Sequence, residues 1–378
     1  MIPIPISRIV LAAGLSLLMI LTGTLTYIAL GARTSKVARA PAKPTEASPQ
    51  AQGLTLPGTI YLSQNGALYS LSAGRFHQLT REAGWMQPSI MPDGNLVVVK
   101  RSAYYSDIYM LNPFGTVTRR ITNNSQPRNS DTGLYHWAFY PRVSADGRTL
   151  WLAYDKPKFA YDVVLSIWSM PASGTINQGR LWGNAADYTG GDVQPLPVKG
   201  GVMYTKYDYA SRYDSKLDAR LVGMLWVASN GFSPGRELTS PGEDCRDPAI
   251  SPDGTQVAMI CTYMKQISYL TVASWNGSKL GPRRTIISDK IVAQPMWAPD
   301  GSGIAFLAPG AGQSGPFQLW WLPKAAYTPQ PTPVPTPTPG GPHNGPLPTP
   351  TAAPAVVIKP IQVTTNNGFD ATSPIAWR

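Results

Sequence analysis

Acidic side chains and one histidine are the residues of this sequence best suited to acid–base chemistry. Asp192, Asp244, Asp247 and Asp370 each precede a short apolar segment, and His136 stands in a similar place. Converging carboxylates can hold a cation, bind a basic peptide, or act as acid and base on a glycan. Hydrogen bonding within the fold is the alternative, and for the lone histidine we expect that role.

Motifs that specify a reaction are absent from the sequence. It contains no Gly-x-Ser-x-Gly, no phosphate-cradling loop and no dinucleotide fingerprint. The histidines His77, His136 and His343 are too far apart to suggest a metal site by their spacing. We therefore predict no catalytic residue, no metal and no cofactor.

Aromatic residues are concentrated in three segments that we expect to be loops: residues 104–105, 156–161 and 206–218. Rigid amphipathic rings suit binding, because they gain contact area at small entropic cost. Charges in these segments nearly cancel, which favours a protein surface or sugar rings over a phosphate backbone. The alternative is that the tyrosines pack on one another. The binding residues predicted here are Tyr104, Tyr105, Phe159, Tyr161, Tyr207, Tyr209, Arg212 and Tyr213.

The sequence contains two cysteines, Cys245 and Cys261. They flank the turn at 252–255 at nearly equal distances, so adjacent antiparallel strands would bring them together. A disulfide across such a loop contributes about 3 kcal/mol and fits an exported protein. Two buried free thiols are the alternative if the body is cytoplasmic.

A repeated Asp-Gly turn organises the chain from residue 58 onward. It occurs at Asp93, Asp146, Asp253 and Asp300, each followed by glycine, and Lys199 stands in its place in one repeat. Asp bonds to the backbone two residues on and Gly accepts a positive φ, so each pair predicts a hairpin turn. An apolar strand, an aromatic-rich strand and a fourth strand follow each turn. Four strands in about 50 residues are one propeller blade.

The two chain ends complete the count of blades. Residues 58–80 provide only three strands, and 373–378 match the inner strand of the other repeats. We predict an all-β, six-bladed propeller over 58–378, closed by its C-terminal strand. The Ser-Pro-Asp-Gly hairpin, its apolar strand and the following Ile-Tyr or Ile-Trp strand resemble the TolB-like β-propeller repeat family. The resemblance implies an envelope or periplasmic protein and a protein-binding platform, although the separate N-terminal domain of TolB itself is missing.

Loops that enter the inner strands of a propeller ring one mouth of its central channel. We therefore expect the four carboxylates and His136 to converge there with Gln87, Gln194, Arg246 and Gln294. This polar ring could hold a cation or a basic peptide. Alternatively, it is polar for structural reasons, as hydrated channels are.

The N-terminal region predicts a membrane anchor. Residues 9–32 carry no charge and would span about 36 Å as a helix, enough for a bilayer. This is long for a cleaved signal, although residues 38–40 offer a small-residue cleavage site. The basic residues that follow favour a cytoplasmic body, whereas the N-terminal position favours export. We predict a signal anchor at 1–33, a flexible linker at 34–57 and a propeller outside the cytoplasm.

Composition excludes other classes of protein. The sequence has 35 Gly and 38 Pro, too many turn formers for a helical fold. Its net charge is +11, but residues 58–323 hold 24 basic and 19 acidic residues, without a basic stripe, so we expect no nucleic-acid partner. Alternating Pro and Thr over 328–355 predict an extended polyproline insertion in the last blade, either a tolerated loop or a glycosylated spacer.

These observations predict a non-enzymatic, membrane-anchored propeller that binds a protein or an envelope glycan. The alternative is an enzyme, either a glycan hydrolase or lyase or a peptide-processing enzyme, with its site at the channel mouth. Two carboxyl groups converging within about 5–10 Å, one with a raised pKa, would favour the enzyme. A purely structural anchor is the third possibility.

Overall fold

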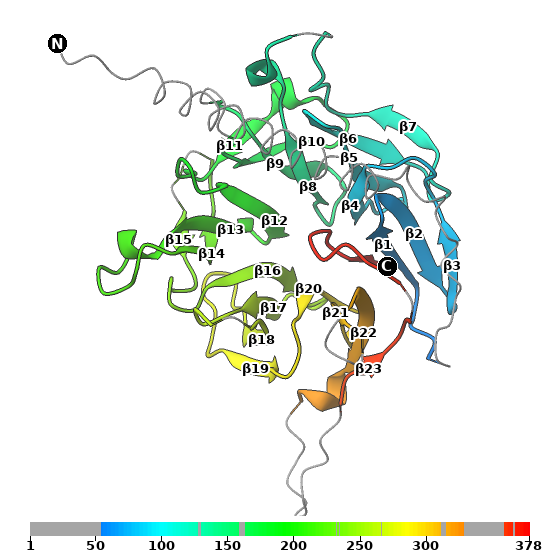
Figure 1. Cartoon of the computed structure of the whole chain (residues 1–378), viewed down its shortest axis with the longest axis vertical. Coiled ribbons are helices and arrows are strands. Elements are labelled where there is room, and N and C mark those ends of the chain that lie inside the picture. Colours follow the sequence, from blue (N-terminus) through cyan, green and yellow to red (C-terminus); the bar gives the residue numbers. More distant parts are fainter. Residues whose placement is uncertain are drawn as a thin grey trace, which may run out of the picture. The chain divides into compact units, whose positions relative to one another are not determined.

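The structure, a computed structural model, describes residues 54–378 apart from 128–129, 159–162, 232, 234, 266, 311–314, 329–358 and 366. The described strands form six four-stranded antiparallel sheets arranged as the blades of a propeller (Figure 1). The all-β, six-bladed prediction is therefore confirmed. The predicted anchor at 1–33, nearly all of the linker and most of the Pro/Thr-rich insertion lie outside the described residues.

Within the described part of the chain, no helix is long and apolar enough to cross a membrane.

Each blade begins with an inner strand beside the central channel and continues outward. Blade 1 consists of β24 (Ala376–Trp377), β1 (Thr59–Gln64), β2 (Ala67–Ser72) and β3 (Arg75–Gln78). Blade 2 consists of β4 (Trp85–Ile90), β5 (Leu96–Arg101), β6 (Ser106–Leu111) and β7 (Val117–Arg120). Blade 3 consists of β8 (Ala138–Val143), β9 (Thr149–Tyr154), β10 (Ser166–Pro171) and β11 (Arg180–Trp182).

Blades 4 to 6 follow the same order. Blade 4 consists of β12 (Asp192–Val198), β13 (Gly201–Tyr209), β14 (Leu221–Ala228) and β15 (Arg236–Glu237). Blade 5 consists of β16 (Cys245–Ile250), β17 (Gln256–Cys261), β18 (Tyr269–Ser274) and β19 (Arg284–Ile287). Blade 6 consists of β20 (Ala293–Trp297), β21 (Gly303–Pro309), β22 (Phe317–Pro323) and β23 (Ile361–Gln362). Four short 3-10 helices lie in connections: η1 (Thr132–Leu134), η2 (Ile176–Gln178), η3 (Ala210–Arg212) and η4 (Lys324–Ala326).

Alternation of strand direction gives the propeller two distinct faces. Connections into the inner strands, and between second and third strands, lie on one face, called here the mouth face. Turns between first and second strands, and between third and fourth, lie on the other, called here the Asp-Gly face. The Asp253 carboxylate accepts from the backbone N–H of Thr255 at 3.1 Å, and Gly254 has a φ of +70°. The turn chemistry predicted for the repeat is therefore present.

Outer strands are short, and a repeated threonine holds them in place. The backbone N–H of Leu68 donates to Thr80 Oγ1 at 2.9 Å, and that of Leu225 donates to Thr239 Oγ1 at 2.8 Å. The same bond recurs in blades 2 and 6. Each threonine satisfies a buried N–H that the short outer strand leaves unpaired.

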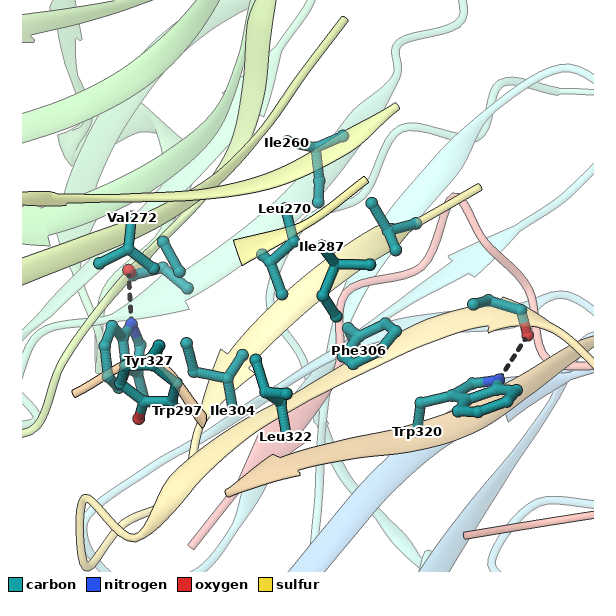
Figure 2. Close-up of a cluster of buried hydrophobic side chains, with 14 residues drawn as sticks. Ile260, Leu270, Val272, Ile287, Trp297, Ile304, Phe306, Trp320, Leu322 and Tyr327 are labelled. Atoms are coloured by element: carbon teal, nitrogen blue, oxygen red, sulfur yellow. Dashed lines mark hydrogen bonds between the residues drawn. The ribbon is translucent and has the colours of Figure 1, made fainter. Parts of the chain in front are cut away.

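The core consists of layers between neighbouring blades. Figure 2 shows the layer between blades 5 and 6, where Phe306 and Trp320 stack with ring centroids 6.5 Å apart. The indole N–H of Trp297 donates to Ala249 O at 3.0 Å, and that of Trp320 donates to Ala308 O at 3.2 Å. Buried polar atoms of the large rings are thus satisfied while the rings fill the layer.

The C-terminal strand β24 pairs with β1, so both chain ends contribute to blade 1. The backbone N–H of Thr59 donates to Arg378 O at 2.7 Å, and the indole of Trp377 donates to Pro57 O at 2.6 Å. The strand β1 therefore starts at the Asp-Gly face, beside the end of β24. One predicted boundary needs correction: β13 continues to Tyr209 through residues that we expected in a loop.

Candidate binding site at the channel mouth

Five inner strands carry the same local distortion near the channel mouth. In each, the residue before a proline has a φ between 51° and 56°, and the pairing with the second strand shifts register. Proline has no N–H to donate to the ladder, so the pairing is interrupted and a bulge forms there. The five residues are Gln87, Tyr140, Gln194, Asp247 and Gln294. Because the distortion recurs in five blades, it belongs to the scaffold.

Hydrogen bonds connect these residues from blade to blade. The backbone N–H of Gln87 donates to Ser373 Oγ at 2.7 Å, and that of Tyr140 donates to Gln87 Oε1 at 2.7 Å. The backbone N–H of Asp247 donates to Gln194 Oε1 at 3.1 Å, and the Gln194 amide donates to the Asp247 carboxylate. Among the described residues no such bond joins Tyr140 to Gln194. The ring is thus interrupted between blades 3 and 4.

A cavity of about 390 Å³ opens at this interruption. Its volume falls in the range of ligand pockets, and its walls are mainly apolar with a few polar groups. The apolar walls come from Met86, Phe139, Tyr140, Leu165, Val193, Tyr207 and Leu221, and the polar groups from Gln87, Arg101, Thr189 and Thr372. Of the predicted binding residues that the structure describes, Tyr207 lines this cavity, and so does Gln87 of the predicted polar ring.

The charges of Arg142 and Asp247 act on each other, although the two residues lie on different blades. Burial lowers the pKa of Arg142 to about 10, and the Asp247 carboxylate opposes that shift. These residues belong to blades 3 and 5, which are not neighbours, so their attraction crosses the channel. Burial raises the pKa of Asp247, opposed by Arg246 and by the Gln194 amide. Burial, with Asp247 nearby, also raises the pKa of Tyr207 to about 12, so its hydroxyl is a neutral donor at pH 7.

The other predicted carboxylates do not line the cavity. Asp192 is fully buried, and its Oδ1 lies 2.9 Å from Lys206 Nζ. Asp244 accepts from the backbone N–H of Gly223 at 2.8 Å and from the Thr262 hydroxyl. Each of these two carboxylates is therefore engaged by donors of the propeller itself.

Asp370 and His136 are also held locally. The Asp370 carboxylate accepts from the backbone N–H and the hydroxyl of Thr372, at 2.9 and 2.7 Å. His136 Nδ1 lies 2.8 Å from Asp155 Oδ1, whose other oxygen pairs with Lys158 at 2.9 Å. No sequence pattern pointed to Asp155, which lies 19 residues from His136.

The remaining predicted aromatic residues mostly pack on neighbours. Tyr105 stacks on Tyr135 with centroids 6.0 Å apart, and Tyr104 lies at the same distance. Tyr213 meets Trp226 edge-on at 6.1 Å, and its hydroxyl donates to Asp208 at 3.0 Å.

The guanidinium of Arg212 lies 5.3 Å from the centroid of the Tyr209 ring and also donates to Asp208, at 2.7 Å. Phe159 and Tyr161 lie outside the described residues.

Exposed apolar side chains gather on the mouth face. Eleven large apolar side chains of the described residues are exposed, and eight of them lie in connections or strand ends on this face. The mouth face thus exposes more large apolar side chains than the Asp-Gly face does. The eight are Tyr104, Leu134, Val163, Tyr188, Tyr213, Leu221, Ile267 and Ile291.

The sequence could have pointed to Tyr140, because it precedes a proline in an inner strand like the glutamines that we did predict. Arg101 and Leu221 carry no such signal, since they reach the cavity from second and third strands. Arg142 follows the same proline, but nothing local indicates that its side chain faces Asp247 two blades away.

Comparison with solved structures identifies the architecture. TolB from Acinetobacter baumannii is 15% identical over 71% of this chain and 62% of its own, with a TM-score of 0.53. The chain folds as a TolB-like six-bladed propeller. This TolB-like propeller is also similar to a putative TolB from Agrobacterium tumefaciens (13% identity, 72% and 86% coverage, TM-score 0.49) and to a gluconolactonase from Xanthomonas campestris (15%, 71% and 84%, 0.44).

No protein-family model matches the TolB-like propeller, and no curated protein matches its sequence.

Proposed function

We propose that this chain is a membrane-anchored, extracytoplasmic binding platform that holds a segment of another protein at its channel mouth and catalyses no reaction. The observation that carries the proposal is the mainly apolar cavity between blades 3 and 4, which opens on the face that exposes most of the large apolar side chains of the described residues. The TolB-like resemblance supports a protein partner over an envelope glycan, which is the other polymer that such a face could bind.

The walls of the cavity indicate what it would accept. Phe139, Leu165 and Val193 suit an apolar side chain, and Arg101 is an exposed cation on the wall that could pair with a carboxylate or a backbone carbonyl. The neutral hydroxyl of Tyr207 adds a hydrogen-bond donor. A peptide segment with an apolar residue next to an acidic one matches this arrangement.

Engagement of the carboxylates supports binding over catalysis. Asp192 is paired with Lys206, Asp244 is held by backbone and hydroxyl donors, and Asp247 is held by glutamine amides. An acid–base pair in a glycosidase needs two carboxyl groups facing one substrate. The fold itself favours neither reading, because its solved relatives include TolB and a gluconolactonase.

The disulfide supports the extracytoplasmic location. Cys245 and Cys261 are direct partners on β16 and β17, and they are joined by a disulfide bond. Structural disulfides persist in oxidising compartments. Together with the uncharged segment at 9–32, this supports an exported body held by an N-terminal anchor.

The test begins with a random peptide library selected on the full chain in mild detergent. Enriched peptides are then measured by fluorescence anisotropy against Leu221→Arg and Phe114→Arg. Both wild-type side chains are exposed, at 45% and 79%, but Leu221 lines the cavity and Phe114 lies on the Asp-Gly face. Loss of binding in Leu221→Arg alone supports the proposal. Equal binding by both variants contradicts it.

A further inference from the structure

The Asp-Gly face carries a second hollow, of about 240 Å³, between blades 4 and 5. Its charged lining residues are Lys199 and Arg236, and no carboxylate lines it. Serine hydroxyls and glycines make up most of the remainder: Ser229, Ser233, Ser278, Gly200, Gly201, Gly235 and Gly277. A hollow with two cations, several hydroxyls and no anion has the composition of an anion site.

Lys199 occupies the turn in which blade 4 departs from the repeat. In blades 2, 3, 5 and 6 an aspartate stands there and its carboxylate accepts from the backbone N–H two residues on, at 2.9 to 3.1 Å. In blade 4 Val198 pairs directly with Gly201, which leaves the two-residue turn Lys199-Gly200. Blade 4 therefore carries a cation, Lys199, at the position where the other four turns carry an aspartate.

The two cations are differently held. Arg236 donates to the backbone oxygen of Ser278 in the next blade, which fixes its guanidinium at the hollow. Lys199 is exposed and has no hydrogen-bond or ion-pair partner among the described residues. A methyl group added at Gly200 or Gly277 would meet no atom within 4 Å, so the space beside the cations is open.

More cations surround the hollow. The turns and outer-strand starts of blades 3 to 5 expose Arg148, Arg180, Lys199, Arg236, Lys279 and Arg284. The exposed carboxylates of the same turns, Asp146 and Asp253, accept bonds from their own turns. Exposed cations therefore outnumber exposed carboxylates in these turns and outer-strand starts of blades 3 to 5.

We propose that this hollow binds a phosphate group through Lys199 and Arg236. A tetrahedral phosphate has enough oxygen acceptors for an ammonium, a guanidinium and serine hydroxyls at once, and its charge offsets that of the two cations. The source that we infer is the headgroup of an anionic phospholipid, because the first strand of the described chain, β1, starts at Thr59 on this same face. The lipid source, unlike the phosphate site, rests on the proposed membrane anchor.

Lysine acetylation read by mass spectrometry tests this on the full chain in nonionic detergent. Lys199 reports on the hollow, and Lys216, exposed on the mouth face, is the matched control. The probes are inorganic phosphate, soluble dihexanoylphosphatidylglycerol and its phosphatidylcholine counterpart, at constant ionic strength. At about ten times its dissociation constant, a bound phosphate slows acetylation of Lys199 about tenfold and leaves Lys216 unchanged.

Each outcome decides one part of the proposal. Protection by phosphatidylglycerol that disappears in Arg236→Gln supports the lipid source. Protection by inorganic phosphate alone keeps the site and overturns the lipid source. Equal behaviour of Lys199 and Lys216 with every probe overturns the site. None of these results depends on a partner at the channel mouth, so the proposed function stands or falls separately.

Discussion

Replacing Lys206 by methionine tests the electrostatics of the blade 4 entry. Lys206 Nζ lies 2.9 Å from Asp192 Oδ1, and both side chains are buried. Burial raises the pKa of Asp192 to about 6, although Lys206 opposes the shift. Removing one partner of a buried pair costs about 3–5 kcal/mol, because the remaining charge is uncompensated. We expect Lys206→Met to lower the free energy of unfolding by about that amount at pH 8.

The pH dependence has a definite sign. The folded-state pKa of Asp192 lies above the unfolded value of about 3.9, so the folded state binds more protons between these two values. Stability contributed by this group is therefore greatest below pH 4 and falls by about 3 kcal/mol as the pH rises through 6. Asp192→Asn removes this slope, and the cost of Lys206→Met shrinks as the carboxyl group is protonated.

Urea unfolding followed by tryptophan fluorescence at pH 4.5 and pH 8 measures both effects. Lys100→Met is the matched control, since its partner Glu82 is 74% exposed and such pairs contribute less than about 1 kcal/mol. A cost for Lys206→Met no larger than that of Lys100→Met, or one independent of pH, would refute the reasoning.

Three further predictions concern stability, each measured by urea unfolding. Replacing Cys245 and Cys261 by alanine removes a cross-link over 16 residues, and we expect a loss of about 3 kcal/mol, reproduced by dithiothreitol on the wild type. Phe306→Ala leaves a cavity in the side-chain layer shown in Figure 2 and should lower the free energy of unfolding by about 3–5 kcal/mol; a loss below about 1 kcal/mol would contradict the packing. Gln194→Leu leaves the backbone N–H of Asp247 unpaired, for an expected loss of about 1–3 kcal/mol; unchanged stability would argue against the channel ring.

Local turn chemistry made the fold predictable from the sequence. An Asp-Gly pair such as Asp253-Gly254 is compatible with only a narrow set of hairpin turns, and the recurrence of this pair along the chain predicts the repeated blades. The placement of Cys245 and Cys261 follows from the same register, since they pair directly across β16 and β17.

The candidate site was harder to predict, because it depends on which side chains meet across blades. Asp192 begins the inner strand β12 and Asp247 lies in the inner strand β16, but Lys206 on the next strand pairs with Asp192 inside the blade. Tyr207 was expected in a loop and instead lies in β13, whose extension brings it to the cavity. Such outcomes depend on partners far apart in the chain, and no local pattern encodes them.

Hydrogen exchange of the full chain, with and without a peptide selected from the library, tests the central claim most directly. The account predicts slower exchange in β8, β12 and the hairpin of β13 and β14, which line the cavity between blades 3 and 4. Protection confined to turns of the Asp-Gly face, or no protection at saturating peptide, would contradict the claim that the channel mouth is the binding site.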